Sequence, residues 1–276
     1  MLTDIIIYSK DRTCQLDFLL RSLKYYFIDC NKVSILEDWS NDIFKSGYDK
    51  IKSINYGLNL EFKKQTRCNF YEILKNSIDS STTSFLLPLC DDDIFIEKTN
   101  IDDISNYMDE NTVGISLRYS KDLTVSYHTG KILPLPIFID AGDYLKWKWS
   151  SYGMIDRWVY PYHAGGLIYE TKFLQRMVSE TSFSLPNSLE SAMMAKRYAW
   201  KKDHLLAFKH SKIVNVSINR IQNDVDNRGG RDINYTPTEL NNIFLNGKII
   251  DTAGLYDMNN NCEFIEVPLK FTEDTR

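Results

Sequence analysis

Short apolar runs alternate with amphipathic segments through the first 120 residues of the chain. Four of these runs have the length and composition of buried strands, and they cover residues 5–8, 32–36, 84–89 and 112–119. The segment after the first run repeats its apolar residues at the spacing of one helix face: Leu16, Leu19, Leu20, Leu23 and Phe27. This β-α-β alternation predicts a Rossmann-like α/β fold, with a mixed, mostly parallel sheet flanked by helices.

Weaker signals complete the predicted elements. Residues 58–64 indicate a further strand, and residues 101–110 a short helix. Asn69 and Glu72 stand at capping-box spacing and predict a helix start. The second half is less regular. We expect one helix capped by Thr171, one from about Ser188, and one capped by Thr236 and followed by Gly247. We expect residues 1–120 and 121–276 to be two halves of one continuous domain.

Composition narrows the functional classes. The formal net charge of −4 argues against nonspecific binding to nucleic acid, so we expect no nucleic-acid partner. The five cysteines are scattered and odd in number, which suggests neither a disulfide framework nor a zinc knuckle. No apolar run approaches the ~20 residues of a membrane span. These features together predict a cytoplasmic protein with reduced thiols.

Three consecutive carboxylates follow the apolar run 84–89. Desolvating Asp91, Asp92 and Asp93 together is costly unless a cation or hydrogen bonds compensate them. In an extended chain alternate side chains share a face, so Asp91 and Asp93 are expected to converge on one ion. Oxygen ligands favour Mg²⁺ or Mn²⁺. The alternative is a solvated turn or a helix N-cap cluster.

The segments that follow two of the predicted strands suggest where a ligand binds. Residues 8–12 ("YSKDR") and 90–93 ("CDDD") both fall at the carboxyl end of a strand. Ligands of parallel sheets gather at that edge. The sequence therefore predicts a binding site between these two loops.

Three segments, in this order, resemble the family-2-like nucleotide-sugar glycosyltransferases: "IIIYSKDRTCQLDFLLRSL", "FLLPLCDDDIF" and "AGGLIYETKFLQRM". The resemblance covers roughly residues 1–200. It implies a GT-A fold, a nucleotide-diphosphate sugar donor, Mn²⁺ or Mg²⁺, and transfer to a hydroxyl of a glycan or lipid-linked acceptor. A hexosyltransferase of surface polysaccharide or glycoconjugate synthesis fits this pattern, with residues 1–120 as the donor half and 121–276 as the acceptor half.

The resemblance also implies residue roles on the donor side. Tyr8, Ser9 and Arg12 stand where the family holds the base, ribose or phosphate of the donor. Asp91 and Asp92 belong to the same donor site, with Asp91 near the ribose and the metal. The direct metal ligand implied by the match is the third carboxylate of the run, Asp93.

The resemblance further implies an acidic catalytic base near a helix start beyond the glycine segment. The best match is Glu190 in "NSLES", where the paired acid typical of the family is missing. Asn187 and Glu190 also stand at capping-box spacing, so the carboxylate has a structural alternative as a cap. Asp156, in "MIDRW", is the reserve candidate for the base.

Further candidates each have a structural alternative. His210 is a candidate to join Asp93 on the metal, or it is simply hydrogen-bonded. The arginines of "RGGR" (Arg228 and Arg231) suit a diphosphate, although paired glycines usually mark a turn. Polar residues after the strand near 213–218 are placed to reach the cleft: Asn219, Arg220 and Gln222. Aromatic residues of the second half suit stacking on an acceptor sugar or packing in the core: Trp147, Trp149, Trp158 and Tyr162.

Three other functions compete with transfer. A haloacid-dehalogenase-like phosphohydrolase also places two aspartates after a strand, but its motif continues differently from Ile94 and Phe95. A sugar nucleotidyltransferase would carry a glycine-rich first loop, which "YSKDRT" lacks. A non-catalytic nucleotide- or glycan-binding protein of the same fold is the third alternative. A lipid-linked acceptor would bring peripheral contact with the inner face of the cell membrane.

Overall fold

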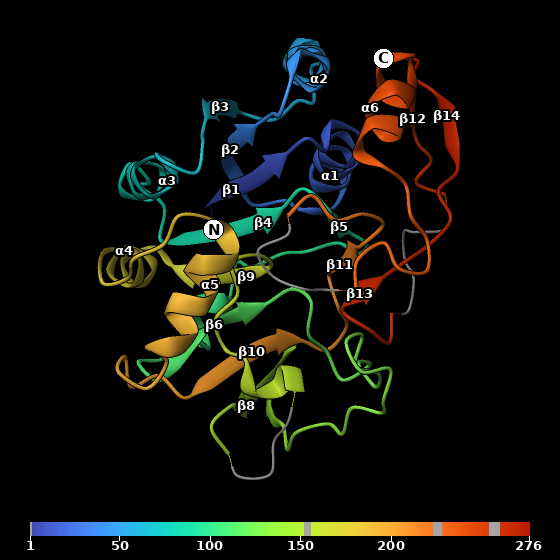
Figure 1. The fold of residues 1–276 in the computed structure, drawn as a ribbon. Helices are drawn as coiled ribbons and strands as arrows, with labels where there is room; N and C mark the ends of the chain where they lie inside the picture. The colour runs from blue at the N-terminus through green and yellow to red at the C-terminus, as the bar shows by residue number, and fades with distance from the viewer. Residues whose placement is uncertain (1, 152–155, 223–227, 254–259) are drawn as a thin grey trace.

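The computed structural model describes residues 2–151, 156–222, 228–253 and 260–276 (Figure 1). A nine-stranded sheet runs through the molecule in the order β3-β2-β1-β4-β9-β6-β10-β8-β7. Strands from both sides of residue 120 contribute to it, so the boundary expected there falls inside one sheet. No helix in the described ranges is long and apolar enough to cross a membrane.

The first half builds the parallel part of the sheet, as the alternation predicts. Its strands are β1 (Thr3–Lys10), β2 (Cys30–Asp38), β3 (Leu60–Lys64) and β4 (Phe85–Cys90), paired in parallel. The connecting helices are α1 (Thr13–Tyr26), α2 (Asp42–Ser53) and α3 (Phe70–Asp79). The predicted mixed, mostly parallel sheet flanked by helices is confirmed.

The second half extends the same sheet with strands of both directions. Those strands are β6 (Thr112–Ser116), β7 (Ile139–Ala141), β8 (Tyr144–Lys148), β9 (Leu167–Glu170) and β10 (His204–Phe208). β9 lies antiparallel between β4 and β6, so β4 and β6 run in the same direction. β10 is parallel to β6, which leaves the carboxyl ends of β1, β4, β6 and β10 at one edge.

Two smaller sheets and three further helices complete the fold. β5 (Asp93–Phe95), β11 (Ile213–Val216) and β13 (Phe264–Ile265) form a three-stranded sheet, and β12 (Lys248–Ile250) pairs with β14 (Phe271–Glu273). The remaining helices are α4 (Thr171–Ser179), α5 (Pro186–Ala195) and α6 (Pro237–Leu245). Single 3₁₀ turns are η1 (Ile104–Asn106) and η2 (Asp156–Val159).

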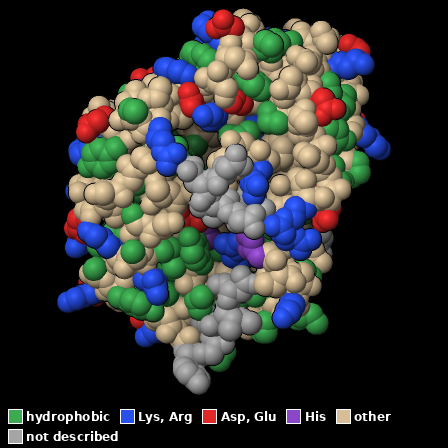
Figure 2. Space-filling view, in the orientation of Figure 1, with side chains coloured by type: hydrophobic (Ala, Val, Ile, Leu, Met, Phe, Trp, Pro, Cys, Tyr) green, Lys and Arg blue, Asp and Glu red, His purple; other side chains and the backbone are tan. Residues whose placement is uncertain are grey.

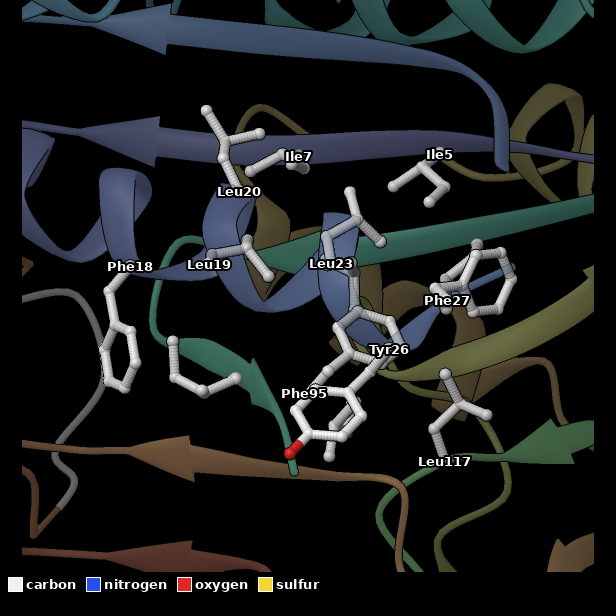
Figure 3. Close-up of a cluster of buried hydrophobic side chains, with 14 of the residues drawn as sticks. Ile5, Ile7, Phe18, Leu19, Leu20, Leu23, Tyr26, Phe27, Phe95 and Leu117 are labelled. Atoms are coloured by element: carbon white, nitrogen blue, oxygen red, sulfur yellow. The ribbon is translucent and has the colours of Figure 1, made fainter. Parts of the chain in front are cut away.

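The core lies on both faces of the large sheet. Ile5 and Ile7 of β1 pack with α1, α2 and α6, whereas Ile6 and Tyr8 face α3, α4 and α5. Figure 3 shows the first cluster, in which leucines of α1 lie between β1 and Phe95. The alternation of side chains along β1 thus divides the buried residues between two helical layers.

Local sequence signals located some boundaries and missed others. The expected cap of α6 is present, since the Thr236 hydroxyl accepts the Glu239 N–H, and Gly247 follows the helix with φ +85°. The helix expected over residues 101–110 is wrong, because only the turn η1 forms. Thr171 is the first residue of α4 rather than its cap, and its hydroxyl donates to the Thr83 carbonyl.

Candidate active site

Polar side chains from distant segments meet where β1, β4 and β6 end. Arg12 follows β1, Arg118 follows β6, and the three carboxylates Asp91, Asp92 and Asp93, here called the carboxylate triplet, follow β4. All five side chains are at most 11% exposed. In Figure 2, several Lys and Arg side chains gather near the centre of the face shown.

Arg12 binds the first two members of the triplet. Its Nη1 donates to Asp92 Oδ2 at 2.8 Å and to Asp91 Oδ1 at 3.2 Å. Its Nη2 donates to the Asn219 carbonyl oxygen at 2.6 Å. One guanidinium therefore links the loop after β1, the turn after β4 and the segment after β11.

A second guanidinium binds Asp93. Arg118 Nη2 lies 2.6 Å from Asp93 Oδ1 and 2.8 Å from Oδ2. The Asn215 amide donates to Asp93 Oδ1 and Asp92 Oδ1, and the Cys90 N–H donates to Asp93 Oδ2. The Asp93 side chain is fully buried. Such charge-assisted hydrogen bonds are the strong class.

The expectation that Asp91 and Asp93 converge on one ion is wrong in its geometry. The chain turns after Cys90, and Asp93 starts β5, which pairs with β11 through Asn215. The alternation of an extended strand does not apply across a turn. Asp91 consequently contacts Arg12 while Asp93 contacts Arg118.

The triplet does not fit a divalent cation in this arrangement. Each of its six carboxylate oxygens accepts a hydrogen bond from a protein N–H, with the Lys10 N–H reaching Asp91 Oδ2 at 3.3 Å. Within the described ranges, no three His, Cys, Asp or Glu side chains are grouped to hold a metal ion. His210, expected beside Asp93, is exposed and pairs through Nδ1 with Asp122 at 2.7 Å.

Burial dominates the electrostatics of the triplet. It raises the pKa of Asp91 to about 7, with Arg12 opposing the rise and Asp92 adding to it. Burial likewise raises the pKa of Asp93, against the effect of Arg118. Both arginines therefore stabilise carboxylates whose ionised form the surroundings disfavour.

Glu190 lies in α5, on the other side of the glycine segment. Its Oε2 accepts the Ala164 N–H at 2.7 Å, and the Tyr160 hydroxyl is also its hydrogen-bond partner. The alternative that Glu190 caps its own helix is wrong. The helix starts at Pro186, and the Ser188 hydroxyl accepts the Leu185 N–H. The half-buried Glu190 side chain thus faces the sheet edge rather than the helix end.

The glycine segment brings the backbone against the triplet. A Cβ at Gly165 would stand 3.1 Å from Asp93 Oδ2 and 3.2 Å from both Arg118 Nη2 and Cys90 Sγ. Gly166 has φ +78°, a conformation that favours glycine. Two glycines are therefore required where β9 starts, and they keep the Glu190 contact at Ala164 next to the carboxylates.

His163 belongs to this site and was not predicted. Its Nε2 is 2.9 Å from the Tyr119 hydroxyl, and its backbone N–H donates to the Tyr169 hydroxyl. Burial, then Arg118 and Arg157, hold the pKa of His163 well below its usual range. The signal available in the sequence was its position one residue before "AGG".

The residues expected to bind the donor lie mostly inside the protein. Tyr8 is buried and packs edge-to-face on Phe70, and the Ser9 hydroxyl bonds to the Tyr48 hydroxyl at 2.8 Å. Asn219 does reach the site, because its carbonyl accepts from Arg12 and its Oδ1 accepts from Gln15. The donor roles of Tyr8, Ser9 and Arg12 stay predictions.

Other candidates have structural partners. Arg228 donates to the Tyr127 carbonyl at 2.9 Å, and Gly230 has φ +75° in a turn. Arg220 and Arg231 are exposed, and Gln222 is half-buried. Asp156 begins η2, and its side chain lies outside the described atoms.

The aromatic residues proposed to stack on an acceptor form part of the core instead. All four are at most 2% exposed: Trp147, Trp149, Trp158 and Tyr162. Trp147 donates to the Trp158 carbonyl and lies at right angles to its ring. No ring face of these four side chains is open to a sugar.

Comparison with known proteins supports the fold. No family model matches the chain, and no curated protein sequence matches it. S. aureus TarS aligns with a TM-score of 0.51 at 14% identity, over 79% of this chain and 37% of that chain. S. aureus TarS 1–349 in complex with UDP-GlcNAc aligns with a TM-score of 0.50 at 15% identity, over 77% and 57%.

The matched part is thus less than two thirds of either TarS chain. The alignment shows that this chain has the GT-A-like fold that its sequence resemblance implied.

Proposed function

We propose that this protein is a glycosyltransferase that moves a hexosyl group from a nucleotide-diphosphate sugar to a hydroxyl of a glycan or lipid-linked acceptor. The observation that carries the proposal is Glu190, held by the Ala164 N–H beside the carboxyl ends of β1, β4 and β6 in a GT-A-like fold. A solved protein of the same fold binds UDP-GlcNAc. The site edge is also where ligands of such sheets gather.

Glu190 is the proposed general base. Its carboxylate takes the proton of the acceptor hydroxyl as the hydroxyl oxygen forms a bond to the anomeric carbon. The bond from that carbon to the diphosphate breaks in the same reaction, and the nucleoside diphosphate leaves with the electron pair. The Ala164 N–H and the Tyr160 hydroxyl orient the carboxylate, because both bind it from the protein side.

The donor diphosphate needs positive charge near it. Lys10, the last residue of β1, and Arg12, in the loop after it, supply positive charge at the strand edge. Lys10 is half exposed, with Asp38 as its partner. The sequence resemblance implies Mn²⁺ or Mg²⁺ at the triplet, but the hydrogen bonds of all six carboxylate oxygens do not fit a cation there. We therefore assign no step to a metal.

A panel of nucleotide sugars tests this proposal. UDP-, GDP-, CMP- and dTDP-sugars are each added with and without Mn²⁺, and thermal unfolding and nucleotide release are measured. A ligand at 100 times its Kd stabilises the folded state by about 2.7 kcal/mol, so one sugar class is expected to raise the Tm.

Release of the nucleotide from the stabilising sugar supports transfer. Stabilisation without release in the presence of varied acceptor sugars favours the non-catalytic binding protein. No stabilisation by any donor, together with release of phosphate from sugar phosphates, contradicts the proposal in favour of the phosphohydrolase.

A further inference from the structure

The hydrogen-bond network around the carboxylate triplet (Asp91, Asp92 and Asp93) gives each of its oxygens at least one N–H donor. The Arg12 guanidinium spans the first two carboxylates, and Asn215 spans the second and third. Arg118 takes both oxygens of Asp93. A divalent cation would bind carboxylate oxygens at about 2.0–2.6 Å. Both oxygens of Asp93 already have two N–H donors each, and each oxygen of Asp91 and Asp92 has one.

The charges of the triplet and its two arginines are a second observation that bears on cation binding. When all three carboxylates are ionised they carry three negative charges, and the two bound guanidiniums offset two of them. The deeply buried triplet is thereby satisfied by side chains of the same protein. With both arginines in place the triplet keeps one net negative charge instead of three, so its attraction for a cation is reduced.

We infer that the carboxylate triplet is closed to divalent cations and that Arg12 is the residue that closes it. Arg118 and Asp93 form the deeper pair, with the Asp93 side chain fully buried. Arg12 and Asp92 are the less buried pair, with side chains 10% and 11% exposed, against 9% for Arg118 and 0% for Asp93. Removing the Arg12 guanidinium frees one oxygen of Asp91 and one of Asp92, side by side.

This inference does not rest on the proposed function, because it concerns cation binding by the protein alone. It predicts that a substitution creates a metal site. The full chain is titrated with Mn²⁺ under electron paramagnetic resonance, in which the signal of free aqueous Mn²⁺ reports the unbound ion. With the wild type, the signal of free Mn²⁺ is expected to equal that of protein-free buffer up to millimolar Mn²⁺. With Arg12→Met, the signal is expected to show one bound Mn²⁺ per chain, with an affinity at least tenfold higher than that of the wild type.

Three controls isolate the guanidinium. Arg12→Lys keeps the positive charge and is expected to stay closed. Asp92→Asn in the Arg12→Met background is expected to lose the acquired site. Arg67→Met removes an exposed arginine and is expected to bind no Mn²⁺. Circular dichroism establishes that each variant is folded, and Arg12→Gln replaces Arg12→Met should the latter unfold.

Two outcomes overturn the inference. One is binding of one Mn²⁺ by the wild type with the affinity of Arg12→Met. The other is a folded Arg12→Met or Arg12→Gln protein that binds no Mn²⁺. Neither result tests the proposed transfer reaction, because nucleotide release is measured in a separate experiment. Absence of nucleotide release would conversely leave the Mn²⁺ titration as it stands.

Discussion

Two sets of carboxylates lie at the same sheet edge, and the protein treats them differently. The triplet is buried, and each of its members is bound by a guanidinium. Glu190 is half-buried, and its Oε2 accepts a backbone N–H from Ala164. Ion pairs with arginine hold the triplet in place. In the described contacts, no guanidinium pairs with the Glu190 carboxylate.

The contrast separates structural from chemical roles. Removing a carboxylate from a buried ion pair leaves a buried charge without its partner, which is strongly destabilising. Removing the charge of a half-buried carboxylate that accepts a neutral N–H costs far less stability. Stability and activity measurements should therefore respond in opposite order at the two sets.

The largest effect is expected for Glu190→Gln. The amide keeps an oxygen that accepts the Ala164 N–H but cannot take up a proton, so transfer should fall by about 10²–10⁴-fold. The rate of nucleotide release in the presence of acceptor measures this loss, and the Tm shift with donor sugar should stay as in the wild type.

Glu273→Gln is the matched control, because the Glu273 side chain is 74% exposed. A Glu190→Gln protein that keeps wild-type turnover would remove Glu190 from the chemistry. Loss of donor binding together with turnover would instead make it a binding residue.

Asp93→Ala should mainly reduce stability. The resemblance implied Asp93 as a metal ligand, but its side chain is fully buried against Arg118 and Asn215. Breaking a buried pair costs about 3–5 kcal/mol, which urea unfolding would measure.

The matched control for this prediction is Asp140→Ala. Asp140 is 76% exposed and faces Lys209 at 3.6 Å, and pairs of this kind contribute about 0–1 kcal/mol. Equal losses in the two variants would mean that the triplet is no more tightly compensated than a surface ion pair.

The sequence predicted those parts of the site that depend on local pattern. Apolar runs located β1, β4 and β6, and strand-end reasoning placed Arg12 and the triplet at one edge. The cap of α6 was also predictable, because Thr236 and Glu239 are three residues apart.

The partners of the triplet were not predictable in this way. Arg118 and Asn215 stand 25 and 122 residues from Asp93, and no local pattern links them. The amino-acid sequence after Cys90 also contains no signal that distinguishes a turn from a continuing strand. Trp147 and Trp158 were ambiguous for a similar reason, since an aromatic residue suits a sugar face and a core equally well until the packing is known.

The smallest expected effect is the pH dependence of stability that His163 contributes. Arg118 acts electrostatically on this imidazole, and the ring of Tyr160, a partner of Glu190, lies 5.3 Å from it, centroid to centroid. The folded protein holds the pKa of His163 well below 6.5, whereas the unfolded chain binds a proton as the pH falls through about 6.5. The unfolded state then carries more protons, so this residue makes stability fall with decreasing pH by up to about 1.4 kcal/mol per pH unit.

From about pH 7.5 upward the imidazole is mostly neutral in both states, and His163 adds little pH dependence. Urea unfolding of the wild type and of His163→Gln between pH 7.5 and 5 measures the difference. If the variant is less stable at pH 7.5, the difference in unfolding free energy between the two proteins should become smaller below pH 6.5. The reason is that only the wild type has a buried neutral imidazole that becomes protonated on unfolding. Parallel curves would mean that His163 binds its proton equally in the folded and unfolded states.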